Sequence, residues 1–234
     1  MVRAIKRSGF TLVELLVIIA IIGLLAGLVL STLARARENG RVARCVSNLR
    51  QWGLALQLYM GDYDDYIPRR GQGVQPLAII NRPEDWFNCL PRYAGAQAFS
   101  NLVAQGAAPH AGDASSIFID PNAQDPGGTY FLPYSMNMYL SPWIRPEQHK
   151  LEEIPKPEQL AFMADAPGQY SSTVPSQLGY SVSARHGGIA NVVFLDGHVQ
   201  SFSGAYLGCG VGEQEQPDIR WQTLTAGINQ APVP

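Results

Sequence analysis

The chain has few cysteines and few charges, and these shortages exclude several classes of protein. Three of its 234 residues are cysteine (Cys45, Cys89, Cys209), an odd number at unrelated spacings. A disulfide-dense scaffold and a Cys-x-x-Cys zinc or redox site are therefore excluded. Charged residues make up 15% and the net charge is −2, so neither a disordered chain nor a basic nucleic-acid-binding protein is indicated. No nucleophile elbow, P-loop or dinucleotide fingerprint is present, and we expect no enzyme.

What the chain does have is one long apolar run near its start. Phe10 to Ala34 is nearly all apolar, and its only charge is Glu14. As a helix rising about 1.5 Å per residue it would reach about 37 Å, enough to cross a bilayer core of about 30 Å. The run is too long for a cleaved secretory signal, and no Ala-x-Ala site closes it before the arginines. We therefore expect a single membrane-spanning helix.

Charge is distributed unevenly around this run. Three basic residues precede it, and five arginines with one opposing acid follow it, whereas the chain from Gln51 onward is acidic. Positive charge beyond the run argues against an amino terminus in the cytoplasm. The basic residues are Arg3, Lys6 and Arg7 before the run, and Arg35, Arg37, Arg41, Arg44 and Arg50 after it.

Residues Lys6 to Glu14 read KRSGFTLVE and resemble the processing site of type IV prepilins and type II secretion pseudopilins. The resemblance implies cleavage after Gly9 by the prepilin peptidase, which also methylates the new amino terminus on Phe10. It places the amino terminus in the cytoplasm, against the charge pattern, and we follow the motif. A carboxylate in lipid is costly, so Glu14 is expected to pair with the amino terminus of a neighbouring subunit. An ordinary signal anchor that contains a chance Glu14 is the alternative.

Apolar residues continue beyond Ala34 at steps of three and four, which predicts that the helix continues. No proline occurs before Pro68. We expect one helix from about Thr11 to about Gly61, whose second half packs on a sheet along this stripe. The stripe comprises Val42, Cys45 or Val46, Leu49, Trp52, Leu56, Tyr59 and Tyr63.

The rest of the chain favours short strands. We predict strands at 116–119, 134–139 and 160–165, and a hairpin over 191–202 with a type I′ turn at Asp196-Gly197. The stretch 71–112 is turn-rich, with at most one strand or short helix. The expected fold is α+β and pilin-like, with a leader (1–9), a membrane half of the helix (10–34), an amphipathic half (35–66), a globular part (67–204) and an irregular tail (205–234).

A second resemblance covers the body. The segment from Cys45 to Tyr59, the Tyr134-Ser-Met-Asn137 element, and His186 followed after nine residues by Asp196-Gly197 resemble the prepilin-type family with a carboxyl-terminal His-x9-Asp-Gly signature, expanded in planctomycetes. That family often has Cys-Pro where this chain has Asp120-Pro121, so a disulfide that uses this cysteine is lost.

Four residues of the body suggest a metal site. Asp165, His186, Asp196 and His198 combine two carboxylates with two imidazoles, a set suited to a divalent ion. The alternative is structural, with Asp196 and Gly197 shaping the turn and His186 bonding to backbone. Their spacing is not typical of catalysis, so we expect no catalytic residue and no cofactor beyond this candidate metal. Cys89 and Cys209 are a candidate disulfide, with Cys45 a buried thiol.

The sequence therefore predicts a structural subunit of a type II secretion pseudopilus or type IV-like pilus. Its expected partners are the prepilin peptidase/methyltransferase, other pilin or pseudopilin subunits, the inner-membrane assembly platform and the bilayer, and no nucleic acid. It would cross the inner membrane once with its body in the periplasm, and then enter a filament. The alternative function is a membrane-anchored periplasmic module that binds a metal or ligand and does not polymerise.

Overall fold

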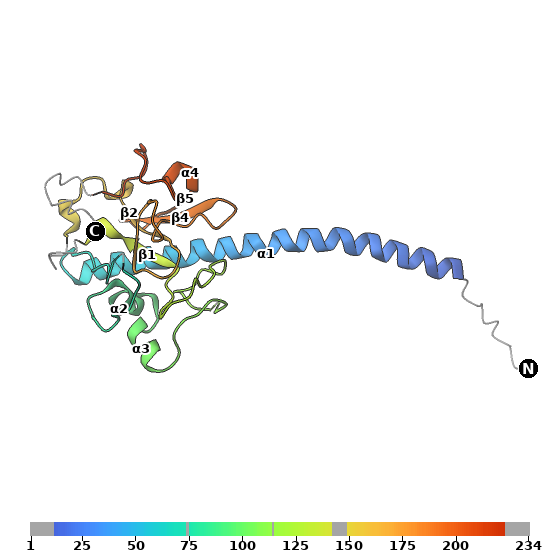
Figure 1. Ribbon diagram of the computed structural model, residues 1–234, viewed down its shortest axis with the longest axis horizontal. Helices are drawn as coiled ribbons and strands as arrows, with labels where there is room; N and C mark the ends of the chain where they lie inside the picture. Colours follow the sequence, from blue (N-terminus) through green and yellow to red (C-terminus); the bar gives the residue numbers. More distant parts are fainter. Residues whose placement is uncertain (1–11, 74, 114, 142–148, 223–234) are drawn as a thin grey trace, which may run out of the picture. The chain divides into compact units, whose positions relative to one another are not determined.

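The fold of the chain is α+β, as expected: one long helix and a five-stranded, mostly antiparallel sheet (Figure 1). The computed structural model describes residues 12–73, 75–113, 115–141 and 149–222. Gly9 and Phe10 lie outside the described residues. Two compact units, residues 1–40 and 41–234, divide the chain, and each is described by itself.

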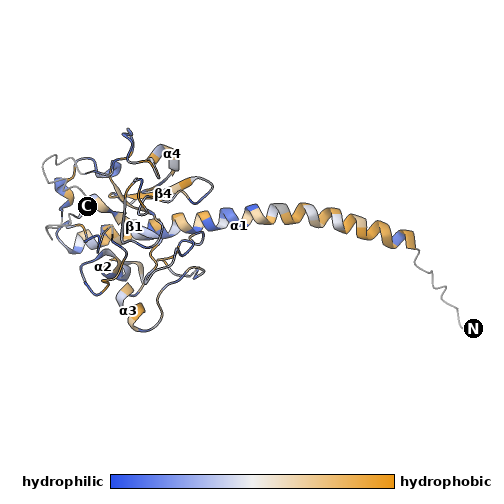
Figure 2. Ribbon diagram, in the orientation of Figure 1, coloured by the Kyte–Doolittle hydropathy of each residue, from blue (hydrophilic) through white to orange (hydrophobic). Residues whose placement is uncertain are grey.

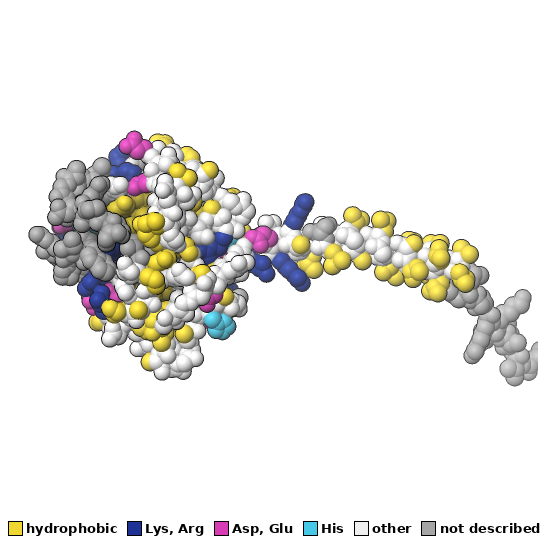
Figure 3. All heavy atoms as spheres, viewed as in Figure 1, with side chains coloured by type: hydrophobic (Ala, Val, Ile, Leu, Met, Phe, Trp, Pro, Cys, Tyr) yellow, Lys and Arg dark blue, Asp and Glu magenta, His cyan; other side chains and the backbone are white. Residues whose placement is uncertain are grey.

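Helix α1 (Leu12–Asp62) confirms the prediction of one continuous helix, and its described part begins with the apolar run. Large hydrophobic side chains between Leu12 and Leu33 are exposed, and a window of 18 residues has a mean hydropathy of 2.9 with none of it buried. Figure 2 shows hydrophobic residues along this part of α1, and Figure 3 shows apolar side chains there and a group of basic side chains after them. By length and composition this part of α1 could span a membrane.

The second half of α1 forms part of the core of the body. The predicted stripe is confirmed at Cys45, Leu49, Trp52, Leu56 and Tyr59, all nearly or fully buried. It packs against residues of the sheet and of the short helices in one hydrophobic cluster. Burial of this apolar face fixes the position of the second half of α1 in the body.

The sheet has the strand order β3-β1-β2-β4-β5. All neighbouring pairs are antiparallel except the parallel pair β1–β3. The strands predicted near 134–139 and 160–165 and the predicted hairpin are confirmed, with shifted ends. The bounds are β1 (Tyr134–Asn137), β2 (Ala161–Asp165), β3 (Ser172–Thr173), β4 (Ile189–Phe194) and β5 (Val199–Ser203).

The strand predicted at 116–119 is wrong, because this segment is a turn whose Ile119 N–H donates to Ser116 O. Its side chains at 117–119 are buried, which explains the apolar pattern. Side chains of α1 take the place of a strand partner. Trp52 Nε1 donates to Ile117 O at 3.2 Å, and Asn48 Nδ2 donates to Ile119 O at 3.0 Å.

The stretch 71–112 holds more than the single element predicted. Buried Trp86, Phe87 and Phe99 anchor short helices to the core, so that few apolar residues suffice to position them. After Gly204, the tail is less irregular than predicted, since it contains most of α4, and Ile219 and Trp221 are buried. The short elements are α2 (Trp86–Cys89), α3 (Phe99–Ala104), α4 (Gly204–Leu207), and the 3-10 turns η1 (Pro91–Ala94), η2 (Met138–Leu140), η3 (Leu151–Glu153) and η4 (Pro157–Gln159).

Candidate functional site

Two regions carry the residues predicted to be functional, and the first is the start of α1. Glu14 lies in the first turn of the described helix, among exposed apolar side chains. A carboxylate in this setting is costly in lipid unless a partner charge compensates it. The processing residues Gly9 and Phe10 lie outside the described residues.

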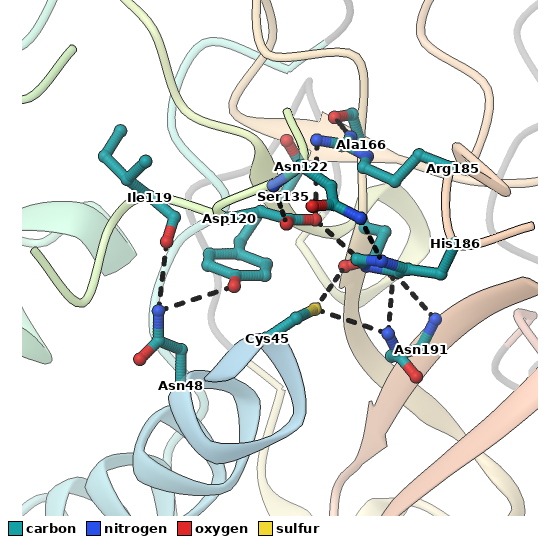
Figure 4. Close-up of polar contacts among 12 residues, drawn as sticks. Cys45, Asn48, Ile119, Asp120, Asn122, Ser135, Ala166, Arg185, His186 and Asn191 are labelled. Carbon is teal, nitrogen blue, oxygen red and sulfur yellow. Dashed lines mark hydrogen bonds and ion pairs between the residues drawn. The ribbon is translucent and has the colours of Figure 1, made fainter. Parts of the chain in front are cut away.

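The second region is a group of four buried side chains that we call the buried cluster: Cys45, Asp120, Asp165 and His186. Their sulfur, oxygen and nitrogen ligand atoms all lie within 4.8 Å of one another. Cys45 comes from α1 and Asp165 from the end of β2, while Asp120 and His186 come from loops. Figure 4 shows Cys45, Asp120 and His186 converging from these separate segments.

His186 lies between the two carboxylates. Its Nε2 is 3.2 Å from Asp120 Oδ2 and 3.5 Å from Asp165 Oδ2. Its Nδ1 lies 3.3 Å from Asn122 Nδ2. The backbone N–H of Asn122 donates to Asp120 Oδ1 at 2.8 Å, so one oxygen of this carboxylate is held by the loop and the other faces the imidazole.

Asp165 joins Cys45 to the sheet. The Cys45 thiol donates to Asp165 Oδ1 at 3.2 Å, and the backbone N–H of Asn191 donates to Asp165 Oδ2 at 2.8 Å. The Asn191 side chain also contacts Cys45 Sγ, at 3.3 Å. The thiol is thus oriented by the first residues of β4 as well as by α1.

Burial and mutual charge shift the pKa values of the buried cluster. Burial raises the pKa of Asp165 to about 6, and the nearby Asp120 carboxylate adds to the shift. For Asp120, burial opposes ionisation, but His186 and Arg185 outweigh it and lower the pKa. For His186, burial disfavours the charged ring, but Asp120 and Asp165 raise the pKa. Burial, and then the charge of Asp165, raises the pKa of Cys45.

Of the residues predicted as a metal set, the structure brings together Asp165 and His186 and places Asp196, Gly197 and His198 at the β4–β5 turn. Asp196 Oδ1 accepts from His198 N–H at 3.1 Å and lies 2.6 Å from His198 Nδ1. Both side chains are partly exposed, and neither joins the buried cluster. Asp196 and Gly197 shape the turn, as the structural alternative predicted. His186 contacts the side chain of Asp120 as well as backbone groups.

The prediction of a type I′ turn is wrong. The loop has three residues, and Gly197 is the one among them with positive φ, +89°. Phe194 N–H donates to His198 O, and Gly197 N–H donates to Phe194 O, a pattern typical of a three-residue hairpin loop with glycine in the left-handed region. The extra residue, Leu195, is fully buried, and its N–H donates to Leu160 O.

We expect Gly197→Val to destabilise the body by about 1–3 kcal/mol, because a β-branched residue is strained at positive φ. A Cβ there would make ordinary contacts, the nearest at 3.5 Å, so the cost comes from the backbone. Asp196→Asn should change stability by less than about 0.5 kcal/mol, since the amide oxygen can accept from His198 N–H. Thermal unfolding of the full chain in detergent would measure both, and equal losses would contradict the loop geometry.

The predicted Cys89–Cys209 disulfide is wrong, because all three cysteines are free thiols. Cys89 packs on the core cluster that contains the α1 stripe, whereas Cys209 packs on the other cluster, around β4 and β5. Cys45 and Asp120 are members of this polar site that the sequence did not predict. The one sequence feature that singled out Asp120 is that Asp120-Pro121 stands where the resembling family often has Cys-Pro.

Comparison with known proteins bears on the first region. The family described as "Prokaryotic N-terminal methylation motif" matches residues 5–30. The chain carries this amino-terminal motif. The chain is similar to type II secretion system core protein G of Aeromonas hydrophila, 37% identical over 78 residues, or 33% of this chain and 52% of the relative. The protein of that name from Escherichia coli is 39% identical over 95 residues, 37% of this chain and 65% of the relative.

The match to these curated relatives is partial. The chain spans about half to just under two thirds of their length. No solved structure matches the chain. The family match covers residues 5–30, so the buried cluster, which lies beyond them, has to be interpreted from its own geometry.

Proposed function

We propose that the chain is a structural, non-enzymatic subunit of a type II secretion pseudopilus or related pilus. The methylation motif at residues 5–30, which continues into an exposed apolar helix with Glu14 in its first turn, carries this proposal. The similarity to type II secretion system core protein G supports the pseudopilus over the pilus.

The physical basis is the exposed apolar half of α1. Its side chains suit lipid before assembly and neighbouring helices after it, so both states bury the same surface. Glu14 gains from assembly, because the amino terminus on Phe10 of a neighbouring subunit can compensate its charge. Removal of residues 1–9 by the prepilin peptidase would expose that amino terminus. We place the amino terminus on the cytoplasmic side of the inner membrane and the body in the periplasm.

A non-polymerising, membrane-anchored binding module is a second candidate, favoured by the buried cluster of potential metal ligands. The two functions differ in their dependence on Glu14. A filament needs the carboxylate, whereas an anchored module would tolerate leucine there.

We expect the mature protein to begin at Phe10 and to carry one methyl group on its amino nitrogen. Intact-mass and amino-terminal peptide mass spectrometry of protein from cells with and without the peptidase would test this. Shearing and imaging of filaments from the same cells would test assembly. A mature chain that still begins at Met1, or one that is processed but never found in filaments, would contradict the proposed function.

A further inference from the structure

The buried cluster contains a carboxylate and an imidazole that face each other out of contact with solvent. Asp120 Oδ2 and His186 Nε2 are 3.2 Å apart, and their side chains are 0% and 1% exposed. Neither atom makes a hydrogen bond to any residue that the structure describes. The two atoms face each other as an ion pair, and a metal ion placed between them would bind both in place of that contact.

We propose that Cys45, Asp120, Asp165 and His186 bind one Zn²⁺ ion. Zinc is held in proteins by four ligands drawn from cysteine sulfur, histidine nitrogen and carboxylate oxygen. The buried cluster supplies one sulfur, one nitrogen and two carboxylates. A thiolate and an imidazole favour zinc over calcium or magnesium, which prefer oxygen ligands alone.

The distances in the buried cluster fit a tetrahedral ion after a small contraction. Bond lengths of about 2.0–2.3 Å to zinc put neighbouring ligand atoms about 3.3–3.8 Å apart. His186 Nε2 lies 3.2 Å from Asp120 Oδ2, and Cys45 Sγ lies 3.2 Å from Asp165 Oδ1. The largest separation, within 4.8 Å, has to close by about 1 Å.

The surrounding groups hold each ligand as an outer shell would. Asn122 N–H fixes Asp120 Oδ1, which leaves Oδ2 directed inward, and Asn191 N–H fixes Asp165 Oδ2. The side-chain nitrogen of Asn122 lies 3.3 Å from His186 Nδ1. Zinc on Nε2 requires a proton on Nδ1, so the Asn122 amide would turn to present its oxygen to Nδ1. Such contacts to ligand residues orient them and strengthen metal binding.

The charges of the site also balance. A Cys45 thiolate and two carboxylates contribute three negative charges, and His186 is neutral when it binds a metal. Zinc supplies two positive charges, and the Arg185 guanidinium, 3.6 Å from Asp120 Oδ2, supplies the third. The ion would tie α1 to β2 and to both loops, and its role would be to stabilise the body. Because no ligand position is open to solvent, a structural ion is favoured over a catalytic one.

The test uses the full chain in detergent, treated with a chelator and then titrated with Zn²⁺ or Co²⁺ alone. We expect one zinc per chain by elemental analysis, a higher unfolding temperature with zinc, and a thiolate-to-cobalt charge-transfer band. Cys45→Ser should abolish the band, and Asp120→Asn and His186→Gln should each weaken binding by at least about tenfold.

Each variant has a matched control outside the buried cluster: Cys89→Ser, Asp196→Asn and His198→Gln. These should bind the metal as the unaltered chain does. Folding of every variant is checked by circular dichroism. If a variant does not fold, the cobalt spectrum of the unaltered chain still tests the proposal. A folded chain that binds no zinc, zinc binding without a thiolate band, or loss of the band in Cys89→Ser would each overturn the proposal. Filament assembly is measured by other means, so failure here leaves the proposed function intact.

Discussion

Replacing Glu14 with leucine is expected to abolish entry of the chain into filaments while leaving membrane insertion intact or improved. The carboxylate costs up to about 2.5–3.5 kcal/mol in lipid, and less near the interface. Its loss would leave the amino terminus of a neighbouring subunit uncompensated. Removing one partner of a buried ion pair costs about 3–5 kcal/mol, so recruitment should fall by at least about a hundredfold.

Membrane fractionation and filament shearing followed by immunoblotting would separate the two effects. Glu14→Gln should fail as well, since it keeps the shape but not the charge. The matched control is Glu38→Gln, which changes the other carboxylate of α1 between Leu12 and Arg50, beyond the apolar run. Normal filaments from Glu14→Leu would show that assembly does not depend on pairing of Glu14 with the amino terminus on Phe10.

The second large effect is expected at Gly53, where α1 crosses the β4–β5 turn. A Cβ built on Gly53 would lie 2.7 Å from Gly197 O and 2.9 Å from Val193 Cγ2. The first of these atoms is backbone and cannot rotate away. Gly53→Ala should therefore destabilise the body by about 2 kcal/mol or more, even though alanine is favoured over glycine in a helix by about 1 kcal/mol.

Gly61→Ala on the same helix is the control. No atom lies within 4 Å of the Cβ position there, so helix propensity should make this variant neutral or slightly more stable. For a chain of this size, the loss at Gly53 corresponds to a fall of about 4–8 °C in the unfolding temperature. A Gly53→Ala chain that melts with the Gly61→Ala chain would show that the helix and the turn do not touch as described.

Periodicity predicted the elements that repeat a simple pattern. The stripe of α1 follows from burial of one helix face, and the continuous apolar run at 160–165 follows from burial of both faces of a strand; both are confirmed. The segment 116–119 has the same apolar composition but is a turn, because Trp52 and Asn48 satisfy its carbonyl groups. Apolar composition indicates that a segment is buried. It does not indicate which group forms hydrogen bonds with the backbone of that segment.

The buried cluster was predicted only in part for a related reason. Asp165 and His186 are conspicuous by residue type, whereas Cys45 occupies a hydrophobic stripe position and Asp120 ends a segment mistaken for a strand. Their meeting depends on tertiary packing over 120 residues of sequence between Cys45 and Asp165. Gly53 is a similar case. In the sequence it is a residue that only weakens a helix, and its close contact with the β4–β5 turn arises from tertiary packing.

The continuity of α1 determines where a soluble fragment of this protein can begin. The body starts at Arg41 in the division into compact units, and Cys45, Asn48 and Leu49 are all buried within it. A truncation at Gln51 would leave Asp165 Oδ1 without its thiol donor and remove part of the core. A fragment that begins at Arg41 keeps these contacts, and its first residues then have to hold a helical turn without the preceding helix. The useful boundary therefore falls inside an unbroken helix, at a position that no loop or proline marks.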